Sequence, residues 1–111
     1  MTMTEATKLA IYIGDSDHHG HKPLSRAIVE MLRTEGVGGA TVFHGIEGYG
    51  AARRIHTAKI LDLSQDLPVL IIAIDREEKI MAVLPKVEEM VQDGLVTLER
   101  VRVVISRPVP I

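Results

Sequence analysis

The chain has 111 residues, a formal net charge of −2 at pH 7 and no cysteine, which suits one domain and excludes disulfides, thiolate catalysis and cysteine-based metal sites. The mixed charge and the small stock of aromatic residues, one Phe and two Tyr, argue against nucleic acid as a partner. The amino terminus lacks a signal-peptide pattern and the longest apolar run, residues 69–74, is too short to cross a bilayer, so we expect a cytoplasmic protein.

The first half of the chain predicts two strands with a helix between them. Residues 9–13 are rich in β-forming types and stop at the turn residues 14–17. Pro23 suits the first turn of a helix and Gly36 suits its end. Residues 40–44 have the composition of a second strand. The buried face of the helix would consist of Leu24, Ala27, Ile28, Met31 and Leu32.

The second half begins with a third strand over residues 69–74, and Pro68 at its start loses no ladder bond. Asp75 can cap the next helix, with Glu78 three residues on as in a capping box. Pro85 lies inside this helix and removes one backbone hydrogen bond, so we expect a kink or a break just before it. The helix would bury Ile80, Val83, Leu84, Val87, Met90 and Val91, and end near Gly94.

The element order defines the fold. A last strand is expected over residues 95–105, followed by an extended or frayed tail at 107–111. The order β-α-β-β-α-β predicts an α+β, ferredoxin-like sandwich with antiparallel sheet order 4-1-3-2 and both helices on one face. The whole chain, residues 1–111, then forms a single domain whose core spans about 7–106.

Two of the predicted strands are apolar on both sides. Residues 9–13 and 69–74 are apolar at consecutive positions, whereas a strand with one wet face alternates. Two helices cover only one face of a sheet. We therefore expect the sheets of several subunits to pack against one another through the other face.

The loop between the second and third strands is the most informative segment. It has glycines at 45, 48 and 50, and then Arg53, Arg54 and His56. Glycine allows backbone N–H groups to converge, and nearby cations favour an anionic ligand. A long solvated hairpin loop is the alternative interpretation. The predicted topology places this loop beside the one that follows the first strand.

Arg100 and Arg102 form a second candidate group. They are two residues apart on the last strand and so share one face, opposite Val101 and Val103. Two such arginines at a cleft between subunits can hold a phosphate with paired hydrogen bonds. Ion pairing with Glu99, with Glu47 or with a neighbouring subunit is the alternative.

These residues resemble the PII signalling proteins. The similar elements are residues 36–42, Gly48-Tyr49-Gly50 and His56-Thr57, which resemble a strand and the base of the PII T-loop. The whole chain is more similar to a PII-like branch that carries a domain-of-unknown-function label. Over about residues 7–106 it shares with that branch Gly14-x-Ser16-Asp17, Gly20-x-Lys22-Pro23-Leu24, Ala27-Ile28-Val29, residues 45–50 and 55–57, and the segments 63–69 and 93–97.

The resemblance implies a PII-like homotrimer with ligand clefts between subunits. A mobile loop, about residues 45–60, would report ligand binding to a target protein such as a membrane transporter or an enzyme. PII proteins bind adenine nucleotides in these clefts, and the matching loop-base positions here are Gly48, Tyr49 and Gly50.

Two further comparisons with PII concern the last strand. Arg100 and Arg102 resemble the Arg-x-Arg pair near the end of PII. The long glycine- and lysine-rich loop that precedes the last strand in PII is represented here only by Asp93 and Gly94. The resemblance therefore implies a small anionic ligand, with a nucleotide as one candidate, without specificity for ATP, and the cofactor stays unknown.

A divalent-metal site is one alternative function. His18, His19 and His21, with Asp15 and Asp17, have suitable ligand types, although their spacing matches no compact zinc motif.

Catalysis is not expected. The sequence shows no Ser/His/Asp or paired-carboxylate arrangement, and neither Ser16 nor Ser25 has an oxyanion-stabilising group beside it. Glu47 and Asp66 are as easily structural. A purely structural protein-interaction module is the remaining alternative.

Overall fold

The computed structural model describes residues 3–50, 56–57 and 66–107, with only the backbone of 56 and 57. No helix in these ranges has the length and apolar character needed to cross a membrane. The elements, in chain order, are β1 (Thr4–Gly14), β2 (His18–His19), β3 (Lys22–Pro23), α1 (Leu24–Thr34), β4 (Ala40–His44), β5 (Glu47–Gly48), β6 (His56–Thr57), β7 (Pro68–Asp75), α2 (Glu77–Met90) and β8 (Leu95–Val103).

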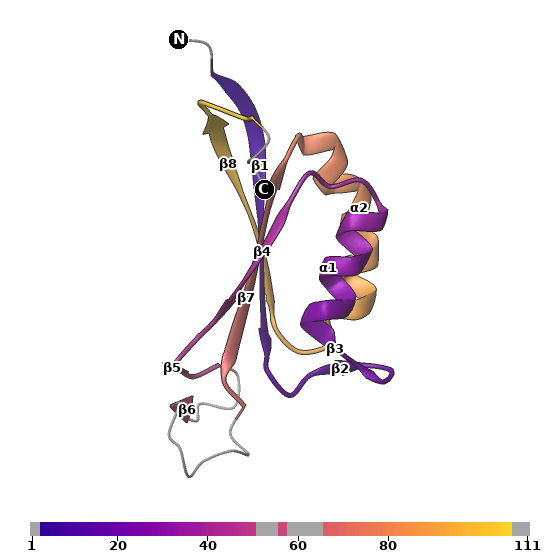
Figure 1. Cartoon of the computed structure of the whole chain (residues 1–111), viewed down its shortest axis with the longest axis vertical. Coiled ribbons are helices and arrows are strands. Elements are labelled where there is room, and N and C mark those ends of the chain that lie inside the picture. Colours follow the sequence, from indigo (N-terminus) through magenta and orange to yellow (C-terminus); the bar gives the residue numbers. More distant parts are fainter. Residues whose placement is uncertain (1–2, 51–55, 58–65, 108–111) are drawn as a thin grey trace.

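Four strands form one antiparallel sheet in the order β4-β7-β1-β8, and both helices cover the same face (Figure 1). For the four long strands this is the predicted order, so the ferredoxin-like architecture is confirmed. Two short ladders, β2-β3 and β5-β6, were not predicted. The last strand ends at Val103, two residues earlier than expected, and residues 108–111 of the predicted tail lie outside the described ranges.

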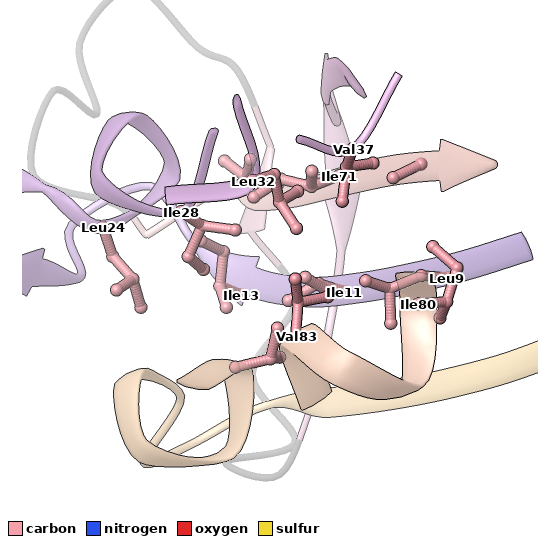
Figure 2. Close-up of a cluster of buried hydrophobic side chains, with 13 residues drawn as sticks. Leu9, Ile11, Ile13, Leu24, Ile28, Leu32, Val37, Ile71, Ile80 and Val83 are labelled. Carbon is pink, nitrogen blue, oxygen red and sulfur yellow. The ribbon is translucent and has the colours of Figure 1, made fainter. Parts of the chain in front are cut away.

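The hydrophobic core lies between the sheet and the helices (Figure 2). Alternate residues of β1 and β7 point toward the helices, as the two-residue period of a strand requires. The apolar stripes of α1 and α2 complete the core, so the periodicity of both segments identified their buried faces. The fully buried side chains are Leu9, Ile11, Ile28, Leu32, Val69, Ile71, Ile80, Val83 and Val87.

The predicted cap of the second helix is wrong, and the helix does not break at Pro85; the kink given as the other outcome there stays a prediction. The N-cap position of α2 is Arg76, and it makes no side-chain cap bond. The carboxylate of Asp75 instead accepts hydrogen bonds from the backbone N–H groups of Gly38, at 2.9 Å, and Arg76, at 2.7 Å. The helix continues through Pro85. Pro85 and Met81 are both exposed, so a carbonyl freed by the missing N–H can bond to water.

The second face of the sheet, here called the open face, has neither of the described helices over it (Figure 1). Cross-strand register places Phe43, Leu70, Tyr12 and Leu95 in one row across it. Phe43 is 50% exposed and Tyr12 is 43% exposed. The sequence prediction that the helix-free face is apolar is therefore confirmed.

Candidate functional site

Three segments that are distant in the sequence meet at one end of the sheet. Residues 14–18, 44–50 and 66–68, here called the loop end, lie where β1 and β4 finish and β7 begins (Figure 1). The backbone N–H of Gly45 donates to Pro68 O at 2.7 Å, and that of Asp15 donates to Leu67 O at 2.8 Å. His44 Nδ1 lies 3.8 Å from Asp15 Oδ1. The two loops are therefore neighbours, as the topology predicted.

Asp66 holds the loop end together. Its Oδ1 accepts a hydrogen bond of 2.8 Å from the backbone N–H of Ser16. Gly14 leaves room for this carboxylate, because a Cβ at Gly14 would lie 2.7 Å from Asp66 Cγ. The N–H of Gly14 in turn donates to Asp17 Oδ2 at 2.9 Å. Sequence reasoning noted these residues but missed their contact, because 50 residues separate Ser16 from Asp66.

The glycine loop begins against Pro68. A Cβ on Gly45 would lie 2.6 Å from Pro68 Cγ, and one on Gly48 would lie 3.0 Å from the same atom. Tyr49 is exposed, and nothing lies within 4 Å of a Cβ built on Gly50. At Gly45 and Gly48 the absence of a side chain therefore serves close packing.

The β5–β6 ladder brings two predicted ligand positions together. Gly48 is the register partner of His56, and Glu47 is the partner of Thr57. The side chain of His56, and all of Arg53 and Arg54, lie outside the described residues. Their role as anion ligands stays a prediction.

Arg100 and Arg102 lie at the other end of the sheet. In the β1–β8 ladder Leu95 pairs with Tyr12, whereas Arg100 pairs with Thr7 and Arg102 with Glu5. Arg100 is thus five residues along the strand from Leu95, or about 17 Å. Within one chain the arginines therefore lie far from residues 45–50, the described start of the glycine loop.

Both arginines are exposed and available to a ligand. Among the residues that the structure describes, none makes an ion pair with either of them. Glu99, a predicted alternative partner, pairs instead with Lys8 at 3.7 Å.

The histidine loop forms the β2–β3 hairpin and is tied to α1. Lys22 Nζ donates to Glu30 Oε2 at 2.6 Å, and this hydrogen bond lowers the pKa of the Glu30 carboxyl. His18 Nδ1 lies 2.6 Å from Ser16 O. The described side chains, which include all the residues proposed for a metal site here, contain no group of three His, Cys, Asp or Glu placed to hold an ion. The geometry gives the metal alternative no support.

Comparison with known proteins identifies the family. The model of the DUF190 family, described as an uncharacterized ACR, matches residues 6–103. A UPF0166 protein of Aquifex aeolicus is 35% identical over 104 residues, which cover 94% of this chain and 98% of that protein.

Two solved structures share the fold. CPII, a nitrogen regulatory PII-like protein from Thiomonas intermedia K12, was solved bound to ADP, AMP and bicarbonate; it superposes with a TM-score of 0.69 at 21% identity, over 92% of this chain and 91% of CPII. TTHA0516 from Thermus thermophilus, described as a PII-like signaling protein, gives a TM-score of 0.67 at 18% identity, over 94% of each chain. The chain therefore belongs to the DUF190 family and has the ferredoxin-like fold of PII-like proteins.

Proposed function

We propose that this protein is a PII-like regulatory trimer that binds a small anion in clefts between its subunits. Binding would be relayed through the loop at about residues 45–60 to a target, such as a membrane transporter or an enzyme. We propose a cytoplasmic location. We also propose that the protein has no catalytic activity, because the loop end shows backbone and carboxylate contacts rather than a nucleophile with its base.

The observation that carries the proposal is the open face. Four apolar side chains cross it in one row, and Phe43 and Tyr12 are about half exposed. Exposed apolar surface of this extent marks an interaction site. Closed symmetry with identical subunits covers the face on every copy, so three chains around a common axis would bury it.

In such a trimer, the clefts between subunits would bring together two groups of residues that are far apart within one sheet. The described start of the glycine loop, residues 45–50, and the two arginines lie at opposite ends of a subunit, so a ligand that contacts both requires two chains. Arg100 and Arg102 are exposed cations without a described ionic partner and suit an anion. CPII was solved with ADP and AMP, so adenine nucleotides are the first ligands to test.

Two measurements test the proposal. Size-exclusion chromatography with light scattering is expected to give three chain masses. ADP or AMP is expected to raise the melting temperature of the wild type, and Arg102→Ala and Arg53→Ala are expected to abolish that rise. Arg33→Ala is the control, because Arg33 lies in the last turn of α1, on the helix layer.

Two results would contradict the proposal. A measured mass equal to that of one chain would contradict the proposed trimer. A trimer whose melting temperature responded to no nucleotide or simple anion would favour the purely structural module instead.

A further inference from the structure

A hollow of about 710 Å³ lies at the arginine end of the sheet, where β1, β8 and the start of α2 meet. The side chains that matter there are Thr7, Arg76, Arg100, Glu5, Glu77 and Glu78. We propose that this hollow binds a small, singly charged oxyanion of the carboxylate type. The inference goes beyond the proposed function, because it gives Arg100 a ligand within a single chain and states the charge of that ligand.

The first observation is the uncapped start of α2. Arg76 offers no side-chain acceptor, and its carbonyl oxygen accepts from Lys79, at 3.0 Å, and Ile80, at 3.1 Å. No described group accepts the backbone N–H of Glu77 or Glu78. Free N–H groups at the positive end of a 14-residue helix favour an anion.

The second observation is Thr7, which is only 6% exposed and is the one buried polar residue of the described ranges. It lies on the helix-covered face of β1, two residues before the core residue Leu9. No described residue hydrogen-bonds its hydroxyl. A buried hydroxyl without a hydrogen-bond partner destabilises the fold, so a ligand oxygen in the hollow that bonded to it would be favoured.

Arg100 completes the donor set from β8. It pairs with Thr7 across the β1–β8 ladder, so the two side chains share a face. Arg76 approaches from the start of α2 and also lines the hollow. The donors are therefore two guanidinium groups, one hydroxyl and the end of a helix, and all of them come from a single chain.

The acidic residues set the charge of the ligand. Glu5, Glu77 and Glu78 line the same hollow as the two arginines, so its side chains carry one more negative charge than positive. Like charges at this range disfavour a dianion much more than a monoanion. A carboxylate or hydrogen carbonate suits the site, whereas a phosphate dianion does not.

The test is a thermal-shift and calorimetric titration of the full chain in mildly alkaline buffer at constant ionic strength. Acetate and hydrogen carbonate are the two monoanion probes, and inorganic phosphate is the dianion probe. At least one monoanion is expected to raise the melting temperature, and phosphate to raise it less. The monoanion that binds more tightly shows whether the site prefers an organic carboxylate or hydrogen carbonate.

Thr7→Val removes the hydroxyl while it keeps the shape of the side chain. It is expected to weaken monoanion binding about tenfold and to leave the unliganded protein at least as stable as the wild type. Thr41→Val, on an exposed position of β4, is the control. The double variant Glu77→Gln and Glu78→Gln is expected to narrow the preference for the monoanion over phosphate.

Unchanged monoanion affinity in Thr7→Val, or phosphate binding as tight as that of the monoanions, would overturn the inference. If nucleotides shift the melting temperature through Arg102 while Thr7→Val changes nothing, only the inference fails. If the chain is a monomer that still binds a monoanion in a Thr7-dependent way, the proposed trimer is wrong and the proposed anion site in the hollow is supported.

Discussion

Ile11 and Tyr12 are neighbours on β1, yet their surroundings differ completely. Ile11 is 0% exposed beneath the two helices, whereas Tyr12 is 43% exposed on the open face. The same contrast extends over β7, where Ile71 is fully buried and Ile74 is exposed. Both faces of these strands are apolar, but the two described helices cover only one. The helix-covered face stabilises the fold, and the open face is left to bind something else.

The largest expected effect is on the helix-covered face. Ile11→Ala would leave a cavity between sheet and helices and lower the free energy of unfolding by about 2–5 kcal/mol, measured by urea denaturation. Ile46→Ala is the control, because Ile46 is 77% exposed, and we expect a change within about 0.5 kcal/mol. Equal losses in the two variants would break the distinction between covered and uncovered apolar residues.

The loop end is expected to tolerate added volume as poorly as the core. Gly14→Ala would drive a Cβ into the Asp66 carboxylate and lower the free energy of unfolding by about 1–3 kcal/mol. Gly39→Ala is the matched control, since nothing lies within 4 Å of a Cβ there. If denaturation shows the two alanine variants to be equally stable, Asp66 does not hold the loop end as described.

The open face is expected to respond through assembly rather than through folding. Phe43→Lys places a charge at the β4 end of the apolar row and should reduce the mass seen by light scattering from three chains to one. The unfolding free energy of the separated chain should change by only about 0.5 kcal/mol, because Phe43 is 50% exposed. Ile46→Lys adds the same charge outside the row and should leave the trimer intact; dissociation of both variants would show a general charge effect.

The smallest expected effect concerns Asp75, at the edge of the helix-covered face. Burial favours its neutral form, but the N–H groups of Arg76 and Gly38 bind the carboxylate and hold its pKa below the ordinary 3.8. A lowered pKa stabilises the fold above the unfolded value, and this stabilisation is lost as the pH falls through the folded value. Asp75→Asn should therefore be less stable than the wild type at about pH 5, above the unfolded pKa, and the gap should be smaller at about pH 3, below it. Denaturation at both pH values measures it, and a constant gap would contradict the assignment.

The sequence predicted the strands and helices well because their signals are local. Apolar spacing identified α1 and α2, and β4 has the bounds that its composition indicated. The prediction that Asp75 caps α2 was wrong because its partner Gly38 is 37 residues away, and capping rules consider only the adjacent helix. The predicted break at Pro85 was wrong because the cost of a proline inside a helix depends on whether the freed carbonyl reaches water.

The candidate site was predictable only in part. Topology placed the two loops of the loop end together, but the contact of Asp66 with Ser16 and Gly14 depends on register and loop path. Sequence also placed Arg100 and Arg102 on one face without showing which end of the sheet they occupy. The buried hydroxyl of Thr7 gave no signal at all, since threonine is ordinary in a strand.

By itself, the sequence determined the element order, the buried helix faces and the two-sided apolar strands, because each follows from the period of the chain. Only the tertiary structure decided how far the glycine loop lies from the arginines, that Asp66 joins the loops, and that Thr7 faces the start of α2 without a described partner. Those features depend on strand register and on contacts between distant residues, which no local pattern encodes.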